Sequence, residues 1–285
     1  MDDLKERALR PADIPAAVEL SSEPGWNQTP EDWRLMIEAG DSFGVFNEAG
    51  RLVASGLTVP YGGRFGWISM ILVTERHRRR GLATRLMRQC MDALLSKGMA
   101  PALDATPEGR QVYLPLGFED VYRITRLFAQ APRRLQAGTP SGVSLRAMEP
   151  SDIQAVVAYD AARCGADRGH IIRHLHGRLP ASAFVARGDS GIAGYALARD
   201  GRTCTQIGPV VAENGAVAAA LMAAALSSIE GPVCVDIVDA HAALRESLAD
   251  AGFTPQFPFI RMIHRQSEPF DDPARVFVIA GPELG

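Results

Sequence analysis

Four arginines stand within five positions of the sequence, at Arg76 and at Arg78–Arg80, and Gly81 follows them. The stretch before them, Gly66–Val73, is compact and apolar, which is typical of a buried strand. The stretch after them, Leu82–Gly98, has apolar residues at near-helical spacing and closes on a glycine that favours a helix C-cap. The arginines are therefore predicted to lie in a turn between a strand and the start of a helix.

A strand-to-helix turn of this composition favours an anion. The first N–H groups of a helix have no partner within it, and the helix dipole adds partial positive charge at that end. Gly81 and Ala83 have little or no side chain, so a phosphate oxygen can approach the backbone closely. The arginines add charge-assisted hydrogen bonds. On these residues alone, a solvated basic surface turn and a nucleic-acid or nuclear-localisation patch stay open as alternatives.

The composition of the whole chain is that of an ordinary globular protein. Of its 285 residues, 47% are hydrophobic and 22% are charged, and this length favours two domains. The net charge of -3 argues against a nucleic-acid binder that depends on bulk charge. The basic cluster is therefore a local feature.

Neither a metal site nor a membrane location is expected. The four cysteines form no CxxC motif, and no carboxylate or cysteine completes a ligand set for His170, His174 and His176. The N-terminal stretch lacks the apolar core of a secretory signal, and the longest apolar run, near 215–226, is too short to span a bilayer. We expect a cytoplasmic protein without a metal cofactor.

The two halves of the sequence resemble each other. Leu-Met pairs begin at Leu86 and Leu221, Gly-Phe pairs begin at Gly117 and Gly252, and the members of each set are 135 positions apart. A shared offset for two anchors indicates an internal duplication. Hairpin-like stretches at 43–59 and 183–199 also correspond in shape.

Each half reads as strand, helix, hairpin, strand, helix, strand, helix and strand, which is a mixed α/β pattern with helices flanking a sheet. Between the halves, residues 133–143 are rich in proline, glycine and arginine and have no apolar period. The sequence therefore predicts two tandem α/β domains, at 1–132 and 144–285, joined by that linker.

The first half resembles a known family at the basic turn. Arg78–Ala83, RRRGLA, matches the [QR]-x-x-G-x-[GA] pyrophosphate-loop motif of the GNAT N-acetyltransferases, and Tyr113–Phe118, YLPLGF, falls where that family has it. Over nearly the whole chain the sequence is similar to the tandem-GNAT subgroup of YitH/HolE type, in which a diverged second GNAT domain follows the first. The resemblance implies two GNAT-like domains.

The resemblance also implies an acetyl-CoA site in the first half. In the family, the main chain of the fourth strand binds the pantetheine amides, and the loop and helix start bind the pyrophosphate. The first role falls on Ile71, Leu72 and Val73. The second falls on Arg78, Arg79, Arg80, Gly81, Leu82, Ala83 and Thr84.

A general acid is implied in the same way, because the family's acid tyrosine stands four residues before the glycine of the Gly-Phe pair, at Tyr113 here. Acetyl transfer requires a neutral amine as nucleophile and a proton for the departing thiolate, which a phenol of pKa ~10 can supply. A tyrosine packed on the cofactor or core stays the alternative. Trp26, Asn27 and Asp104 are expected on the acceptor side.

The second half departs from the pattern. Its loop, Val211–Met222, has no arginine and is three residues shorter than its counterpart, and Leu248 stands at the tyrosine position. We expect this domain to have no acetyl transfer of its own.

The leading interpretation is an N-acetyltransferase that moves an acetyl group from acetyl-CoA to a primary amine of a small molecule or peptide, with no nucleic-acid or membrane partner. An acetyl-CoA sensor without turnover, and an RNA-binding module that uses the arginine turn, are the competing functions. The sequence does not identify the acceptor, the general base or the oligomeric state.

Overall fold

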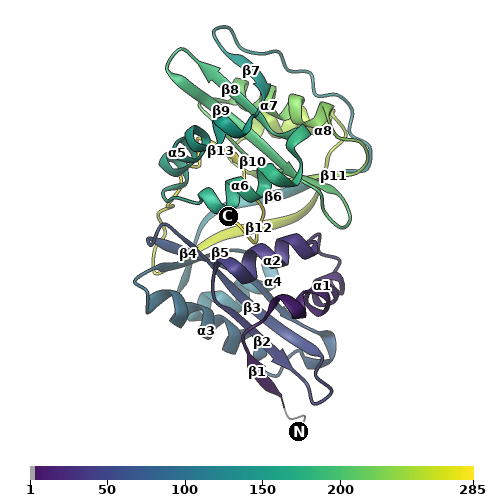
Figure 1. Cartoon of the computed structure of the whole chain (residues 1–285), viewed down its shortest axis with the longest axis vertical. Coiled ribbons are helices and arrows are strands. Elements are labelled where there is room, and N and C mark those ends of the chain that lie inside the picture. Colours follow the sequence, from purple (N-terminus) through teal and green to yellow (C-terminus); the bar gives the residue numbers. More distant parts are fainter. Residues whose placement is uncertain (1–3) are drawn as a thin grey trace. The chain divides into compact units, whose positions relative to one another are not determined.

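The computed structural model describes residues 4–285, so the first three residues of the predicted domain 1–132 lie outside it. The chain forms two compact units, Met1–Leu103 with Gly201–Thr203, and Asp104–Asp200 with Cys204–Gly285. Both units are mixed α/β, which confirms the predicted fold class (Figure 1). These units are defined by how compactly the chain packs, and they do not coincide with the two halves of the repeat. The domain boundaries at 132 and 143 stay a prediction.

The first unit holds a sheet in the order β1-β2-β3-β4-β5, in which only β4 and β5 are parallel. Its strands are β1 (Lys5–Arg7), β2 (Ser42–Phe46), β3 (Leu52–Tyr61), β4 (Phe65–Val73) and the first residues of β5 (Ala100–Ala105). Its helices are α1 (Ile14–Ser22), α2 (Pro30–Ala39) and α3 (Leu82–Leu95), with short 3-10 turns at η1 (Pro11–Asp13) and η2 (Glu75–His77).

Helix α3 follows the predicted apolar period. Its buried residues recur three and four positions apart, and this face packs on β3 and β4. They are Leu82, Leu86, Met87, Cys90, Met91 and Leu94. The helix ends at Leu95, three residues before the predicted Gly98, and Gly98 has the left-handed backbone of a helix stop (φ 73°). The sheet and this helix together fix the turn that holds the arginines.

The second unit holds the strand order β12-β6-β11-β13-β10-β9-β8-β7. Its strands are β6 (Phe118–Ala129), β7 (Ser144–Ala147), β8 (Phe184–Gly188), β9 (Gly191–Arg199), β10 (Thr205–Ala212), β11 (Val233–Val238), β12 (Thr254–His264) and β13 (Val276–Val278). Its helices are α4 (Pro107–Tyr113), α5 (Ile153–Cys164), α6 (Gly169–Arg178), α7 (Gly215–Ser227) and α8 (Ala242–Asp250), with 3-10 turns η3 (Leu114–Leu116), η4 (Pro150–Asp152) and η5 (Pro180–Ser182).

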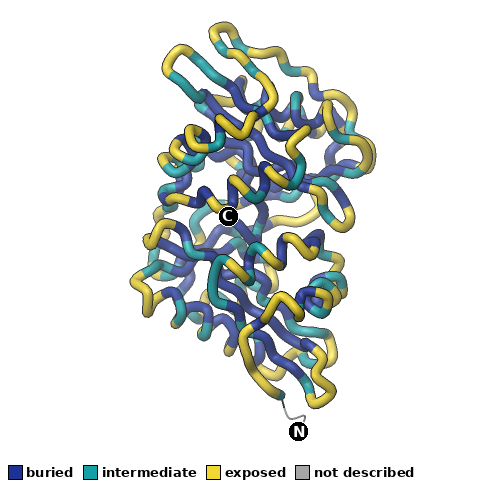
Figure 2. Tube along the Cα trace, viewed as in Figure 1, coloured by how far each residue is buried: buried dark blue, intermediate teal, exposed yellow. Residues whose placement is uncertain are grey.

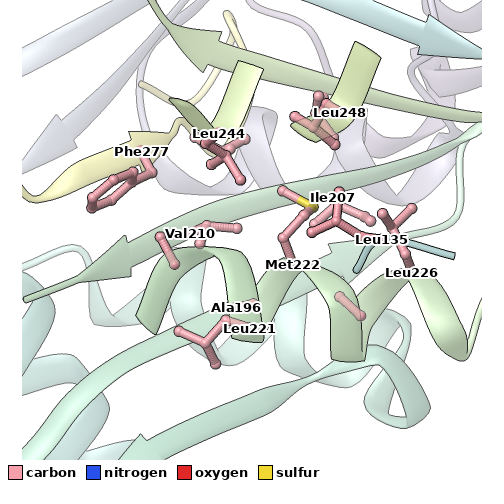
Figure 3. Packing of buried hydrophobic residues seen from close by; sticks show 14 of the residues in the cluster. Leu135, Ala196, Ile207, Val210, Leu221, Met222, Leu226, Leu244, Leu248 and Phe277 are labelled. Carbon is pink, nitrogen blue, oxygen red and sulfur yellow. The ribbon is translucent and has the colours of Figure 1, made fainter. Parts of the chain in front are cut away.

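The core of the second unit lies between its strands and the helices α7 and α8. The side chains drawn in Figure 3 come from both helices, from β10 and from β13, and they include Leu221, Met222, Leu244 and Phe277. Leu248, which stands at the tyrosine position of the repeat, is fully buried among them. Buried residues follow most of the strands (Figure 2), whereas β1 and β7, at the two ends of the strand order, hold none.

Strand β6 belongs by sequence to the first half, but it lies between two strands of the second half. It pairs antiparallel with β11, from Ala129–Val233 to Ile124–Val238. On its other edge it pairs antiparallel with β12, again through Ile124, which faces Phe259. The predicted order of elements is wrong at two points: two helices, α1 with α2 and α5 with α6, precede each hairpin where one was predicted, and β13 follows the last predicted strand. The pairing of strands from different halves is a finding of the structure.

Candidate functional site

The predicted pantetheine strand, β4, is irregular where it passes Gly56 of β3. The β3–β4 ladder shifts register between Ser55 and Leu57, and Met70 has a left-handed backbone (φ 53°), which is uncommon for a residue with a side chain. The hydroxyl of Ser55 donates a hydrogen bond to the Met70 carbonyl oxygen at 2.8 Å. A β-bulge of this kind turns the following residues of a strand toward a new direction.

A glycine stands opposite the bulge, where side chains pack closely on the backbone. A Cβ atom added at Gly56 would lie 2.8 Å from Cδ1 of Ile71 and 3.2 Å from Sγ of Cys90. The β4–β5 ladder ends at Trp67–Ala102, whereas β4 runs on through Ile71 to Val73. A strand that outruns its ladder presents main-chain N–H and C=O groups along its edge, which suits a ligand that carries amides.

The start of α3 presents donors without an intrahelical acceptor. Gly81 is the N-cap residue, with a left-handed backbone (φ 77°) and no side chain to cap the helix. The first helical bond is donated by the Arg85 N–H to the Gly81 carbonyl at 3.0 Å. The N–H groups of Leu82, Ala83 and Thr84 precede it and therefore point out of the helix end. No carboxylate stands in this first turn, so the site is suited to an outside anion.

The arginines of the turn are exposed, and one of them strains the backbone. Arg79 has a left-handed conformation (φ 59°), a costly state for a residue with a side chain that tends to persist at functional positions. Arg78 donates from Nε to the Val73 carbonyl oxygen at 3.2 Å, which ties the turn to the end of β4. Arg85 forms an ion pair with Glu6. The turn thus combines a defined backbone geometry with exposed cationic groups.

Tyr113 is the last residue of α4, in the second unit. A Cβ added at Gly109, one turn earlier, would lie 2.9 Å from Cε2 and 3.3 Å from the hydroxyl oxygen of Tyr113, so the ring crosses this glycine. The ring centroid lies 6.1 Å from that of Phe118, which in turn lies 5.7 Å from the ring of His264. The half-buried phenol is held by packing on these groups, as a positioned acid requires.

Asp104 is engaged by a partner from β12. Arg261 donates from Nε and Nη2 to both carboxylate oxygens of Asp104, at 3.0 and 2.9 Å, and from Nη1 to Asp271 at 2.7 Å. Burial raises the pKa of Asp104 to about 6, although Arg261 acts in the opposite direction. The Tyr122 hydroxyl donates to Asp271 at 2.6 Å and completes the cluster. These contacts favour a positioning role for Asp104.

Trp26 and Asn27 hold three residues from the second half of the sequence, Gly201–Thr203, which belong to the first unit. The Asn27 Oδ1 accepts from the Thr203 N–H and hydroxyl, both at 2.8 Å, and its carbonyl accepts from the Arg202 N–H at 2.9 Å. The Arg202 guanidinium donates to the Trp26 carbonyl at 3.1 and 3.2 Å. The second half therefore contributes a loop to the region predicted to bind the acceptor.

Gln28, next to these residues, has an unsatisfied carbonyl. Its side chain is buried, and its Oε1 has no hydrogen-bond partner among the described atoms. An orphan acceptor of this kind destabilises a ligand-free protein and marks a position where a ligand or a water can donate. No sequence pattern singles out Gln28, because the signal is its burial and not its type.

Among residues 4–285, no three or more histidine, cysteine, aspartate and glutamate side chains gather into a metal-binding group. In the same range, no helix has the length and apolar character needed to cross a bilayer.

Comparison with known proteins shows the family of the chain. A family model described as "Acetyltransferase (GNAT) family" matches residues 8–118, and one described as "Acetyltransferase (GNAT) domain" matches residues 156–278. The chain belongs to the GNAT acetyltransferase family. Its two matches confirm the tandem arrangement, and the chain is an acyltransferase, which disfavours a sensor without turnover.

Two curated relatives cover most of the chain. The N-acetyltransferase YitH of Bacillus subtilis is 26% identical over 248 residues, which is 84% of this chain and 84% of YitH. The holothin acyltransferase of a Pseudoalteromonas species is 26% identical over 250 residues, which is 87% of this chain and 82% of that protein.

Solved structures share the fold of this GNAT chain at low sequence identity. A putative acetyltransferase from Pyrococcus horikoshii superposes with a TM-score of 0.78 at 19% identity, covering 99% of this chain and 96% of that one. A tandem GNAT protein from the clavulanic acid biosynthesis pathway gives 0.63 at 16% identity, covering 92% and 98%.

Proposed function

We propose that this GNAT protein transfers an acetyl group from acetyl-CoA to a primary amine, and that the diphosphate of coenzyme A binds at the start of α3. The observation that carries the proposal is the turn itself. Gly81 opens the helix end, three N–H groups precede the first helical bond, the first turn of α3 has no acidic residue, and Arg78, Arg79 and Arg80 supply positive charge beside it. A doubly charged diphosphate is the group that these features suit best.

The rest of the donor site follows along the chain. We propose that the main chain of Ile71, Leu72 and Val73, beyond the bulge, binds the pantetheine amides of acetyl-CoA. Leu82, Ala83 and Thr84 bind the diphosphate through their N–H groups. Tyr113 then protonates the departing thiolate, a contribution of roughly 10²–10⁴ in rate.

The acceptor is proposed to be an amine on a small molecule or peptide. Trp26, Asn27 and Asp104 stay the predicted residues on this side. The contacts of Asn27 with Thr203 and of Asp104 with Arg261 support an indirect role, in which they hold the surfaces that the acceptor meets. Trp26 has a half-buried aromatic side chain, which we propose contacts the acceptor directly.

The experiment is a panel of primary amines incubated with acetyl-CoA, with free-thiol release as the signal. A wild-type protein that releases thiol only when an amine is present supports the proposal. Tyr113→Phe should lower kcat by roughly 10²–10⁴ while leaving the Kd of coenzyme A unchanged. The matched control is Tyr159→Phe, because Tyr159 packs in the second half and its hydroxyl donates to the Ala193 carbonyl.

Two outcomes would contradict the proposal. Coenzyme A that fails to bind at millimolar concentration would remove the donor site. A Tyr113→Phe variant as fast as wild type would leave the donor site standing and remove only the general acid.

A further inference from the structure

The second unit contains its own counterpart of the β4–β5 pair. β10 and β11 are parallel and pair over Thr205–Ile207 with Val233–Val235, as β4 and β5 pair over Phe65–Trp67 with Ala100–Ala102. In each case the ladder is three residues long and the first strand continues beyond it. The second domain therefore has the framework of a pantetheine slot.

That slot is filled by a strand of the same chain. Past the ladder, Val210 and Val211 of β10 pair antiparallel with Val278 and Val276 of β13. On the other side, Ile237 of β11 pairs with the same Val278. β13 therefore lies between the two parallel strands, where they separate.

Main-chain hydrogen bonds extend this contact at both ends. The Ala212 N–H donates to the Arg275 carbonyl at 3.0 Å, and the Ile279 N–H donates to the Asp236 carbonyl at 3.1 Å. The approach is close enough that a Cβ added at Gly208 would lie 2.1 Å from the Ile279 carbonyl oxygen. Backbone groups that could bind the amides of a pantetheine arm are thus used by the chain itself.

Side chains anchor β13 in the core. Phe277 is 4% exposed, and its ring stacks on His241 with 3.8 Å between centroids. The His241 Nε2 lies 3.0 Å from the Val276 carbonyl oxygen, within hydrogen-bond distance. Figure 3 shows Phe277 in the same cluster as Leu244 and Val210. A segment held by burial on this scale is part of the folded core and not a loose tail.

The helix start beside this slot is also occupied. Asn214 caps α7, and its Oδ1 accepts from the Val217 N–H at 3.1 Å, whereas Gly81 caps α3 with no side chain. The residue before the cap is Glu213, which pairs with Arg163 and, at 3.1 Å, with Arg275. The guanidinium groups of Arg163 and Arg275 are thus engaged by a carboxylate of the chain itself.

We infer that β13 is the resident ligand of the second domain's pantetheine slot and that the chain binds one acyl-CoA, at the first domain. The inference rests on the proposed donor site at α3. It assigns a structural occupant to a slot that the GNAT fold otherwise offers to acyl-CoA. The second domain then contributes its framework and the Gly201–Thr203 loop.

The test is a calorimetric titration of the full chain with coenzyme A, using a matched pair of variants. Ala83 and Ala216 are each the second residue of their helix, and neither is fully buried. Wild type should bind one coenzyme A per chain, Ala83→Glu should raise its Kd by about 10²-fold, and Ala216→Glu should match wild type in both number and Kd.

The outcomes separate the two ideas. Two coenzyme A molecules per chain, or one that survives Ala83→Glu but is lost in Ala216→Glu, would overturn the inference and leave acetyl transfer possible. If wild type does not bind coenzyme A, both the proposed donor site and the stoichiometry of one coenzyme A per chain are overturned.

Hydrogen exchange of the full chain tests the occupant directly. The Ala212 and Ile279 amides should exchange as slowly as those in the centre of β11, with or without saturating coenzyme A. Faster exchange of both amides on adding coenzyme A would mean that β13 yields the slot to the ligand, and would overturn the inference.

Discussion

The substitution Ala83→Glu places a carboxylate in the first turn of α3, where the donor site is proposed. For the helix alone the change is nearly neutral. A negative charge at a helix N-terminus stabilises by about 0.3–1 kcal/mol, and glutamate loses a few tenths of that to the better helix propensity of alanine. The free energy of unfolding should therefore change by less than about 1 kcal/mol.

The effect on coenzyme A should be large and of opposite sign. A carboxylate about 5 Å from one diphosphate charge, at an effective dielectric constant of about 20, repels it by roughly 3 kcal/mol. That energy corresponds to an increase in Kd of about 10²-fold or more. Ala83→Gln has the same shape without the charge, so its Kd should stay closer to that of wild type.

Calorimetry with coenzyme A and urea unfolding give the two quantities. A third measurement isolates the diphosphate: turnover of S-acetylpantetheine, which lacks it, should be unaffected by the glutamate. If Ala83→Glu binds coenzyme A as tightly as Ala83→Gln does, the helix start is not the diphosphate site. If both variants are unfolded, the expectation that this substitution changes the free energy of unfolding by less than about 1 kcal/mol is wrong.

Other residues give predictions of their own. Asn27→Ala removes the acceptor of two hydrogen bonds from Thr203, so urea unfolding should show a free energy of unfolding lower by about 1–3 kcal/mol. An unchanged urea midpoint would mean that the Gly201–Thr203 loop does not depend on Asn27. Gln28→Met should raise the stability of the ligand-free protein by about 1 kcal/mol and raise KM for any amine that the wild type acetylates; a loss of stability would show that Oε1 has a partner in solution. Because burial raises the pKa of Asp104 to about 6, above an unfolded value of ~3.9, the native state binds this proton more tightly than the unfolded chain. The unfolding free energy of wild type should therefore fall relative to Asp104→Asn as pH rises from about 4 to about 7, and a constant difference between the two would contradict the raised pKa.

Local pattern was enough to predict the elements around the donor site. The apolar period of α3, the left-handed glycine after it and the compact strand before it are all properties of neighbouring residues. The motif RRRGLA then identified the family, and family models and tandem relatives confirm it. The start of α3 at Leu82 agrees with the prediction because Gly81 leaves the helix no earlier place to begin.

Features that depend on contacts between residues far apart in the chain could not be predicted from the sequence. β13, which lies between β10 and β11, is a short apolar stretch, Val276–Val278. A stretch of this kind could pair with many strands, so its sequence does not show which ones it joins. The burial of Gln28, the Arg261 partner of Asp104 and the contact of Asn27 with Thr203 join residues far apart in the chain. Periodicity describes which face of an element is apolar but not which element covers it.

The register of the β6–β12 pairing is symmetric about one residue pair. Ile124 faces Phe259, and these two are 135 positions apart, the offset of the internal repeat. The register is reciprocal around this pair: Thr125 faces Pro258 and Arg123 faces Ile260, as equivalent residues do across a two-fold axis between identical subunits. One polypeptide thus holds both strands of a symmetric contact, and because β6 is paired on both edges, a protease that nicked residues 133–143 would not free it from its partners.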